Sequence, residues 1–197
     1  MWRELKLVNA NLRLQQDFLP EPAATRLFHA LTDAVTWRRD RIKLFGKSME
    51  IPRLHQWFAD DGLSYTWSGL TMTPQPWLDE LIDIREQIEA ACDYPFNSVL
   101  ANLYRDGSDS MGWHADDEPE LGHQPVIASL SLGAERDFVM RCRDDETAKK
   151  QYMKLQHGSL LLMAGDTQRY WQHSLPKRRK ISEPRINLTF RLIRPGS

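Results

Sequence analysis

Cysteine is scarce in this sequence, and long apolar runs are absent. The 197 residues include two cysteines, Cys92 and Cys142, which cannot form a disulfide framework and belong to no Cys-x-x-Cys pair. The longest apolar runs, such as 160–164, are far shorter than a membrane-spanning helix requires. The first residues also lack the apolar core and cleavage site of a secretory signal. We therefore expect a protein of a reducing compartment, the cytoplasm or a eukaryotic nucleus, with no membrane partner.

An excess of charge of one sign is missing too. Lys and Arg number 26 against 27 Asp and Glu, so a polycation that binds nucleic acid by bulk charge is excluded. The 7 Trp, 7 Phe and 5 Tyr supply enough apolar surface to argue against a disordered chain. Basic residues nevertheless gather locally, either as solvated surface or as contacts for phosphates. One cluster is Lys177–Lys180, and the other sets six basic residues against Asp40 and Glu50: Arg38, Arg39, Arg41, Lys43, Lys47 and Arg53.

Hydrophobic periodicity predicts two helices followed by many short strands. Apolar residues at helical spacing predict helices over 20–36 and over 76–91, the second opened by Pro76. Alternating or continuous apolar stretches bounded by turn residues predict strands over 99–104, 126–132, 138–143, 160–164 and 185–193. This order is typical of an α+β fold whose second part is a β-sandwich or barrel.

The last strand carries polar residues on one face only. Strict alternation puts Arg185, Asn187, Thr189 and Arg191 on one side and apolar residues on the other. The polar side faces either water or a ligand cavity. In the second case, six residues at about 3.4 Å each separate the two Arg Cα atoms by about 20 Å, so both guanidinium groups can converge on an extended dicarboxylate.

A short His-x-Asp motif is a candidate metal site. On an extended segment, His114 and Asp116 point the same way and can bind one ion together. A third ligand would complete a two-His-one-carboxylate site, which suits non-haem Fe(II). His123, His157 and His173 all remain open by spacing; we prefer His173 because it lies in a strand-like stretch, whereas His157 precedes a glycine in a turn-like setting. No Cys-rich zinc site, G-x-S-x-G motif or Gly-rich phosphate loop offers a competing chemistry.

Together these motifs resemble the AlkB family of Fe(II)/2-oxoglutarate-dependent dioxygenases over residues 42–193. The matching stretches are Asn102–Tyr104, His114–Glu118, Ile127–Gly133, His157–Leu161, His173–Pro176 and Arg185–Arg191. The sequence is most similar to the subgroup of AlkB homologues two and three, whose substrate lid is matched by Leu44–Lys47, Pro52–Arg53 and Gly62–Gly69.

The resemblance implies a double-stranded β-helix (jelly roll) core under an N-terminal nucleotide-recognition lid of helices and hairpins. Residues 1–92 are then the helices and lid, and 93–197 the dioxygenase core, within one compact unit. It also resolves the third ligand: His114, Asp116 and His173 are implied to hold the catalytic iron, and His157 becomes a structural turn residue. The implied 2-oxoglutarate-binding residues are Asn102, Tyr104, Arg185, Asn187 and Arg191.

The substrate side is implied in the same way. Phe45 is expected to act as a wedge that fills the gap left by a flipped base, and Trp67 to stack on that base. Each has a plain structural alternative, as a buried hairpin residue and as a core residue. The remaining implied substrate contacts are Tyr65, Ser68, Asp117 and Glu118, the last two being otherwise a solvated turn.

The implied activity is direct repair of 1-methyladenine and 3-methylcytosine in single- or double-stranded DNA. Oxidation with Fe(II), 2-oxoglutarate and O2 releases formaldehyde, succinate and CO2, and the damaged base is extruded at low cost because its pairing is already broken. An RNA demethylase and a protein or small-molecule hydroxylase on the same fold remain alternatives. We expect a monomer.

Overall fold

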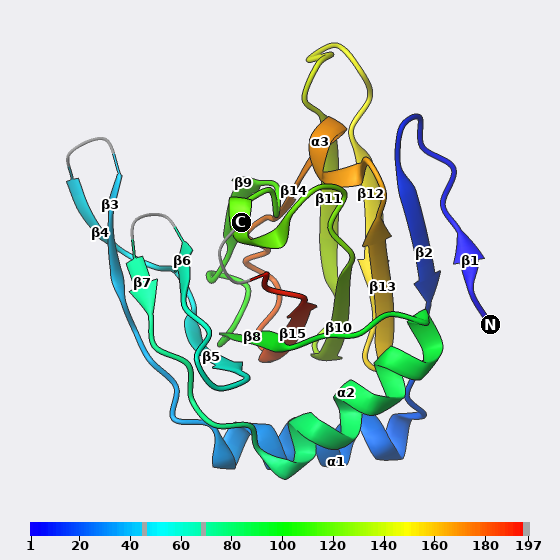
Figure 1. Cartoon of the computed structure of the whole chain (residues 1–197). Helices are drawn as coiled ribbons and strands as arrows, with labels where there is room; N and C mark the ends of the chain where they lie inside the picture. The colour runs from blue at the N-terminus through cyan, green and yellow to red at the C-terminus, as the bar shows by residue number, and fades with distance from the viewer. Residues whose placement is uncertain (45–46, 68–69, 195–197) are drawn as a thin grey trace.

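The structure is a computed structural model that describes residues 1–44, 47–67 and 70–194. In this part of the chain, two antiparallel sheets carry the fold (Figure 1). The larger sheet runs in the order β1 (Arg3–Glu4), β2 (Asn11–Gln15), β13 (Ser159–Ala164), β10 (Ile127–Gly133), β15 (Arg185–Arg191), β8 (Ser98–Tyr104) and β5 (Leu54–Ala59). The smaller sheet runs in the order β12 (Gln151–Leu155), β11 (Arg136–Cys142), β14 (Trp171–Leu175) and β9 (Met111–His114). The expected α+β jelly roll is confirmed, and the larger sheet draws strands from both sides of residue 92.

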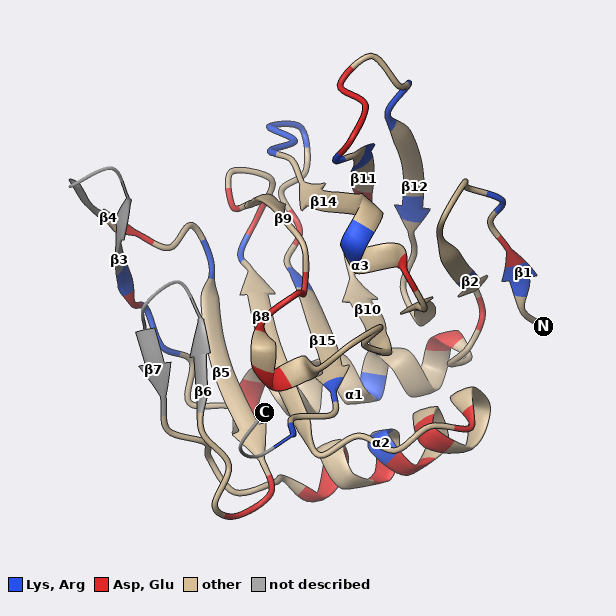
Figure 2. Ribbon diagram, turned by 45° about the horizontal axis from the view of Figure 1, so that its top comes forward, with Lys and Arg blue, Asp and Glu red and all other residues tan. Residues whose placement is uncertain are grey.

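Two helices cover the outer face of the larger sheet (Figure 1). They are α1 (Glu21–Ala34) and α2 (Asp79–Cys92), close to the ranges predicted from periodicity. Leu31 and Ile88 are fully buried in the cluster that these helices form with the sheet. The outer helix faces are charged, as Figure 2 shows, so each helix divides into a buried apolar stripe and a solvated side.

The start of α2 differs from the prediction by three residues. Pro76 does not open the helix, because Trp77 is tied to a neighbouring loop: its indole Nε1 donates to Asp60 Oδ1 at 2.8 Å, and Arg85 lies 4.4 Å from its ring centroid. The helix begins instead at Asp79, where two acidic residues in the first turn favour an N-terminus.

The central strands β13, β10, β15 and β8 of the larger sheet are buried on both faces, which explains the almost continuous apolar run of β13. In β13, Leu160 and Leu162 pack toward the helices, whereas Leu161 and Met163 belong to the cluster between the two sheets. All seven residues of β15 are buried. The polar side of this strand therefore faces the interior between the sheets and not water.

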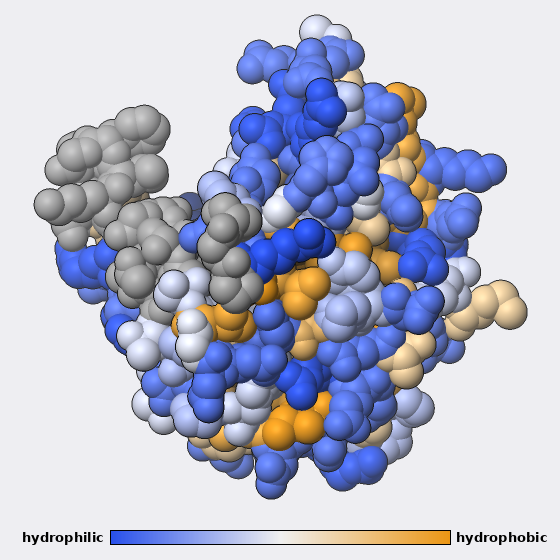
Figure 3. Space-filling view, viewed as in Figure 1, coloured by the Kyte–Doolittle hydropathy of each residue, from blue (hydrophilic) through white to orange (hydrophobic). Residues whose placement is uncertain are grey.

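Two small hairpins lie beside the β5 edge of the larger sheet (Figure 1). They are β3 (Arg41–Leu44) with β4 (Lys47–Glu50), and β6 (Tyr65–Trp67) with β7 (Leu70–Met72). Two short helical turns connect other strands. The turn η1 (Pro119–Leu121) lies between β9 and β10, and α3 (Thr167–Tyr170) lies between β13 and β14. Among the described residues, no helix is long and apolar enough to cross a membrane. Figure 3 shows a mostly hydrophilic face with small, separate apolar areas.

Candidate metal and co-substrate site

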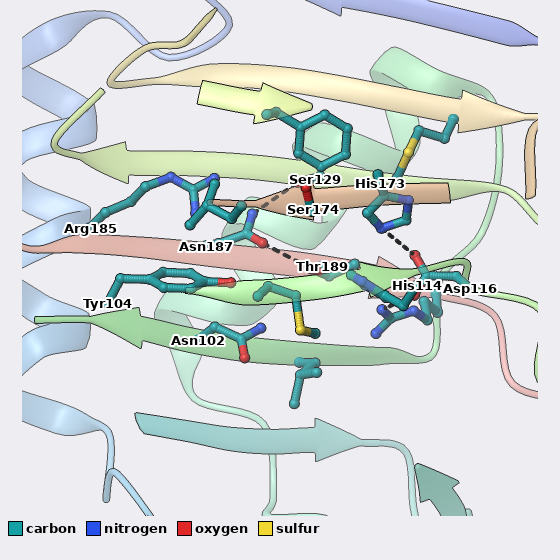
Figure 4. Close-up of a pocket in the computed structure, with 16 residues that line it drawn as sticks. Asn102, Tyr104, His114, Asp116, Ser129, His173, Ser174, Arg185, Asn187 and Thr189 are labelled. Atoms are coloured by element: carbon teal, nitrogen blue, oxygen red, sulfur yellow. Dashed lines mark hydrogen bonds and ion pairs between the residues drawn. The ribbon is translucent and has the colours of Figure 1, made fainter. Parts of the chain in front are cut away.

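Two histidines meet directly across a strand pair of the smaller sheet. His114 at the end of β9 is the register partner of His173 in β14, and their ring centroids lie 4.2 Å apart. Asp116 follows β9 by two residues and points into the same space (Figure 4). One ligand atom from each of the three lies within 4.8 Å of the others. In the described part of the chain this is the one group of His, Cys, Asp or Glu that could hold a metal ion.

Asp116 is fixed from two directions. Its Oδ1 accepts a hydrogen bond from Arg191 Nη2 at 2.6 Å, and its backbone N–H donates to Gln168 Oε1 at 3.0 Å. Burial alone would raise the pKa of Asp116, but the charges of Arg191 and the two histidines outweigh it and lower the pKa to about 2. The carboxylate is therefore ionised near neutral pH, and its Oδ2 remains directed at His173.

The histidines are in the form that binds a metal. Burial lowers the pKa of both, for His173 to about 3, so the imidazoles are neutral near pH 7. The His114 Nδ1 lies 3.0 Å from the Gly112 carbonyl, which can only accept, so this nitrogen carries the proton and Nε2 keeps its lone pair. The His173 ring stacks on Phe138, with centroids 5.0 Å apart.

These groups fit one ion. His173 Nε2 and Asp116 Oδ2 are 3.8 Å apart, longer than a hydrogen bond. Two ligands of a single ion, each about 2.1 Å from it, are separated by a distance of this size. Two neutral imidazoles and one carboxylate leave further positions open, as non-haem Fe(II) requires.

A buried arginine defines the opposite end of the same cavity. Arg185, the first residue of β15, is 2% exposed, and its Nη2 donates to Ser131 Oγ at 2.9 Å. Its register partner Tyr104 presents its ring 5.4 Å from the guanidinium carbon. Burial lowers the pKa of Arg185 to about 10, which leaves it charged near neutral pH. Its Nε has no hydrogen-bond partner, and among the described residues no carboxylate pairs with it.

Neutral polar groups lie between the two ends. Asn187 donates to Ser129 Oγ and to the Leu130 carbonyl, and its Oδ1 accepts from Thr189 at 3.2 Å. Across the strand pair, Asn102 is the register partner of Asn187. These residues line one cavity together with His114, Asp116 and His173, and Figure 4 shows their side chains directed into it.

This arrangement fits a keto-diacid bound to a metal. One carboxylate can pair with Arg185, whose buried Nε lacks an acceptor. The rest of such a molecule can extend along the neutral amides and hydroxyls to the open side of the His-Asp-His group. The polar face of β15 thus lines a ligand cavity, in which Arg191 also donates to Asp116 Oδ1.

The other predicted residues are only partly placed by the structure. Asp117 and Glu118 lie just beyond the cavity lining, and Asp117 pairs with Arg143 at 2.6 Å. Tyr65 and Trp67 fall within β6, and their side chains are outside the described part of the structure. Phe45 and Ser68 lie outside the described residues altogether.

The two competing histidines do not join the metal group. His123 is exposed on the loop before β10. His157 is a turn residue, as implied: its Nδ1 accepts from the Gly133 backbone N–H at 2.8 Å, so its Nε2 donates to Thr25 Oγ1 at 3.1 Å. These two bonds join the turn before β13 to the end of β10 and to α1.

Arg53 corrects the interpretation of the first basic cluster. It was counted there among basic residues that are either solvated or in contact with phosphates, but it is 2% exposed and its Nε donates to Asn102 Oδ1 at 2.7 Å. The prediction was wrong because Arg53 immediately precedes β5, whose pairing with β8 turns it toward the cavity. Other members of the cluster pair on the surface, Arg38 with Asp40 and Arg39 and Arg41 with Glu50.

Several supporting residues were not identified from sequence. Ser129 and Ser131 alternate with apolar residues in β10, and this period of two could have revealed them as a polar inner row. Gln168 and Phe138 carry no such signal, because their contacts with Asp116 and His173 join segments far apart in the chain.

Comparison with known proteins agrees with this geometry. A family model described as the 2OG-Fe(II) oxygenase superfamily matches residues 11–191. The chain is 45% identical over 161 residues to the DNA oxidative demethylase ALKBH2 of Bos taurus, covering 79% of this chain and 58% of the bovine protein. It is 42% identical to ALKBH2 of Mus musculus, covering 87% and 76% of the two chains. It is 40% identical to alpha-ketoglutarate-dependent dioxygenase alkB homolog 3 of Homo sapiens, covering 92% and 66%.

A structural match supports the fold alone. The solved structure of OsALKBH1 superposes with a TM-score of 0.69 at 17% sequence identity, covering 98% of this chain and 100% of that one. The chain spans less than two thirds of the length of the bovine relative. The superfamily uses Fe(II) with 2-oxoglutarate and O2, and the His-Asp-His group suits that metal. With relatives this similar over most of their length, and with this site, the chain belongs to the AlkB family of Fe(II)/2-oxoglutarate-dependent dioxygenases.

Proposed function

We propose that the protein is an oxidative demethylase that repairs N-methylated bases, 1-methyladenine and 3-methylcytosine, in DNA. The observation that carries the proposal is a cavity that has a His-Asp-His group at one end and a buried Arg185 at the other. Relatives that are 42–45% identical are named DNA oxidative demethylases, which supports DNA as the polymer.

The proposed roles follow the geometry of the cavity. His114, Asp116 and His173 hold the iron; Arg185 and Tyr104 bind the far carboxylate of 2-oxoglutarate; Asn102 and Asn187 orient its chain. Arg191 keeps Asp116 ionised and turned toward the metal. When bound, Fe(II) with 2-oxoglutarate and O2 hydroxylates the N-methyl group, yielding succinate and CO2, and the product then loses formaldehyde to restore the base.

The protein itself needs no nucleophile for this reaction. Its residues bind the co-substrate, exclude water from a buried cavity and present the methyl group to the metal. We propose that Trp67, Tyr65 and Ser68 contact the flipped base, that Asp117 and Glu118 lie beside it, and that Phe45 fills the gap in the duplex.

The basic segment Lys177–Lys180 is a proposed phosphate contact. Figure 2 shows these Lys and Arg residues in the loop that follows β14, the strand that carries His173. Lys177, Arg179 and Lys180 are exposed, so a nucleic-acid backbone can reach them.

The test is formaldehyde release from methylated single-stranded DNA, duplex DNA and RNA, assayed side by side with Fe(II) and 2-oxoglutarate. We expect release from methylated DNA and none from unmethylated strands or from the Asp116→Ala variant. Release from RNA alone would change the polymer to RNA. No release from any methylated nucleic acid would refute the proposal.

A second assay tests the wedge. Phe45→Ala should slow repair of duplex DNA more than repair of single strands, because only a duplex needs its gap filled. Equal slowing of both substrates would remove this role from Phe45.

A further inference from the structure

Arg136 is a buried arginine that serves no part of the cavity lining. It is the first residue of β11 and 1% exposed. Its guanidinium donates to three backbone carbonyls, those of Asp106 at 3.1 Å, Asp109 at 2.9 Å and Pro176 at 2.9 Å. A cation this deeply buried is costly, so its position calls for a reason beyond packing.

The three carbonyls belong to two loops that Arg136 joins. Residues 105–109 form the turn directly after Tyr104, and Pro176 directly precedes the basic segment. The loops also bond each other: Gly107 N–H donates to Ile181 O at 2.8 Å, and Arg178 N–H donates to Gly107 O at 2.7 Å. The approach is so close that a Cβ on Gly107 would lie 1.8 Å from the Arg178 carbonyl oxygen.

The same guanidinium lies behind the co-substrate end of the cavity. Its central carbon is 5.9 Å from the Tyr104 ring centroid, and that of Arg185 is 5.4 Å from the same centroid. Tyr104 therefore contacts both cations. Neither Arg136 nor Arg185 forms an ion pair with a carboxylate of the described residues. An anion that binds at Arg185 adds the negative charge that this end of the cavity lacks.

We propose that Arg136 is a positioning residue that couples 2-oxoglutarate binding to the docking of the basic segment Lys177–Lys180. The co-substrate carboxylate stabilises the arrangement of Tyr104, Arg185 and Arg136. Arg136 in turn holds the 105–109 turn and the basic segment together. The importance of this coupling for DNA contact rests on the proposed function, whereas the coupling itself is measurable without nucleic acid.

The first test uses the unmodified chain and trypsin, which cleaves after the exposed Lys177, Arg179 and Lys180. Under anaerobic conditions with Fe(II), saturating 2-oxoglutarate should slow cleavage within the basic segment by about fivefold or more, the usual size of such coupling. Cleavage at other sites on the surface should not change. An unchanged rate within the segment would overturn the proposal, whether or not the enzyme demethylates DNA.

The second test separates the two loops without touching Arg136. Gly107→Ala should speed cleavage of the segment and, because coupling is reciprocal, weaken 2-oxoglutarate binding by a similar factor in calorimetry. Ser108→Ala is the matched control: it lies on the same turn, is exposed, and its side chain bonds only within that turn. Faster cleavage in Gly107→Ala with unchanged 2-oxoglutarate affinity would refute the coupling.

Arg136 itself is tested by its conservative variant. Arg136→Lys keeps a positive charge near Tyr104 but lacks the planar fork that reaches three carbonyls, so we expect both faster cleavage and weaker 2-oxoglutarate binding. If the basic segment of Arg136→Lys is cleaved faster but the variant binds 2-oxoglutarate with normal affinity, Arg136 does not couple the two, and its positioning role is overturned. Circular dichroism checks that the variant folds, and Gly107→Ala decides the question if it does not.

Discussion

The two ends of the cavity balance charge in opposite ways. At the metal end, Asp116 is already paired with Arg191 at 2.6 Å and lies beside two neutral imidazoles. At the co-substrate end, Arg185 and the nearby Arg136 have only neutral partners among the described residues. The metal end is thus organised by the protein alone, whereas the co-substrate end holds buried cations that an incoming carboxylate completes.

This difference separates preorganisation from recognition. Asp116 is oriented before any ion binds, because Arg191 donates to its carboxylate and Gln168 accepts from its backbone N–H. An arginine with an unsatisfied Nε favours a ligand with a matching anion, because that ligand removes a cost which the free protein bears. Variants at the two ends should therefore behave differently.

The largest expected effect is at the metal end. Asp116→Ala removes the one anionic ligand, and we expect Fe(II) affinity to fall by more than about 100-fold, with turnover abolished. Calorimetry with Mn(II) or anaerobic Fe(II) measures this directly. Asp117→Asn is the matched control for metal binding, because that carboxylate pairs with Arg143 away from the cavity. Near-normal metal affinity in Asp116→Ala would exclude it as a ligand.

The next effect concerns the stability of the ligand-free protein. Asp116→Ala leaves Arg191 buried without its carboxylate and should lower the free energy of unfolding by about 3–5 kcal/mol. Arg185→Met removes a buried cation that pairs with no carboxylate, so stability should change by less than about 1 kcal/mol or rise. Chemical denaturation without metal or 2-oxoglutarate compares the two. Equal destabilisation by the two variants would show that the charge of Arg185, like that of Asp116, is already compensated in the ligand-free protein.

A third effect isolates recognition of the co-substrate. Arg185→Met should raise the KM for 2-oxoglutarate by about 30-fold, near 2 kcal/mol, because a charge-assisted bond is lost. The KM for methylated DNA should change little, since Arg185 lies at the far end of the cavity. A parallel rise in both values would argue against a carboxylate contact at this residue.

The sequence predicted those elements of the fold whose hydrophobic periodicity was clear. Periodicity located α1, α2 and the strands β8, β10, β11, β13 and β15 to within a few residues, because each combines a buried face with clear end signals. β5 escaped, since its buried His55 and Gln56 interrupt any apolar alternation. β2 alternates in Asn-Leu-Arg-Leu-Gln but is too short to stand out.

The candidate site could be predicted only in part, because it depends on contacts between segments that are far apart in the sequence. The polar row of β15 is visible as alternation, but whether it faces water or a cavity depends on the smaller sheet that covers it. The third ligand depends on pairing between β9 and β14, which spacing along the chain leaves open and the family resemblance supplied. Arg53, Gln168 and Arg136 act through contacts between distant segments, which no local pattern reveals.

The smallest expected effect lies outside the cavity, at the ion pairs that help hold the basic segment. Burial would raise the pKa of Asp137, but Lys154 and Arg178 beside it lower the pKa below its usual value. A carboxyl whose folded pKa is lowered adds stability above its unfolded pKa and loses it as the pH falls through the folded value. Asp137→Asn should therefore cost about 1 kcal/mol near pH 7 and nothing once the pH is below the folded pKa.

Denaturation of both chains across this pH range measures the difference. Glu135→Gln is the matched control, because its carboxylate reaches only Lys154, at 3.5 Å and with both side chains exposed. Its effect should be smaller at every pH. A cost for Asp137→Asn that persists in acid would show that packing, rather than charge, secures Arg178 against Asp137.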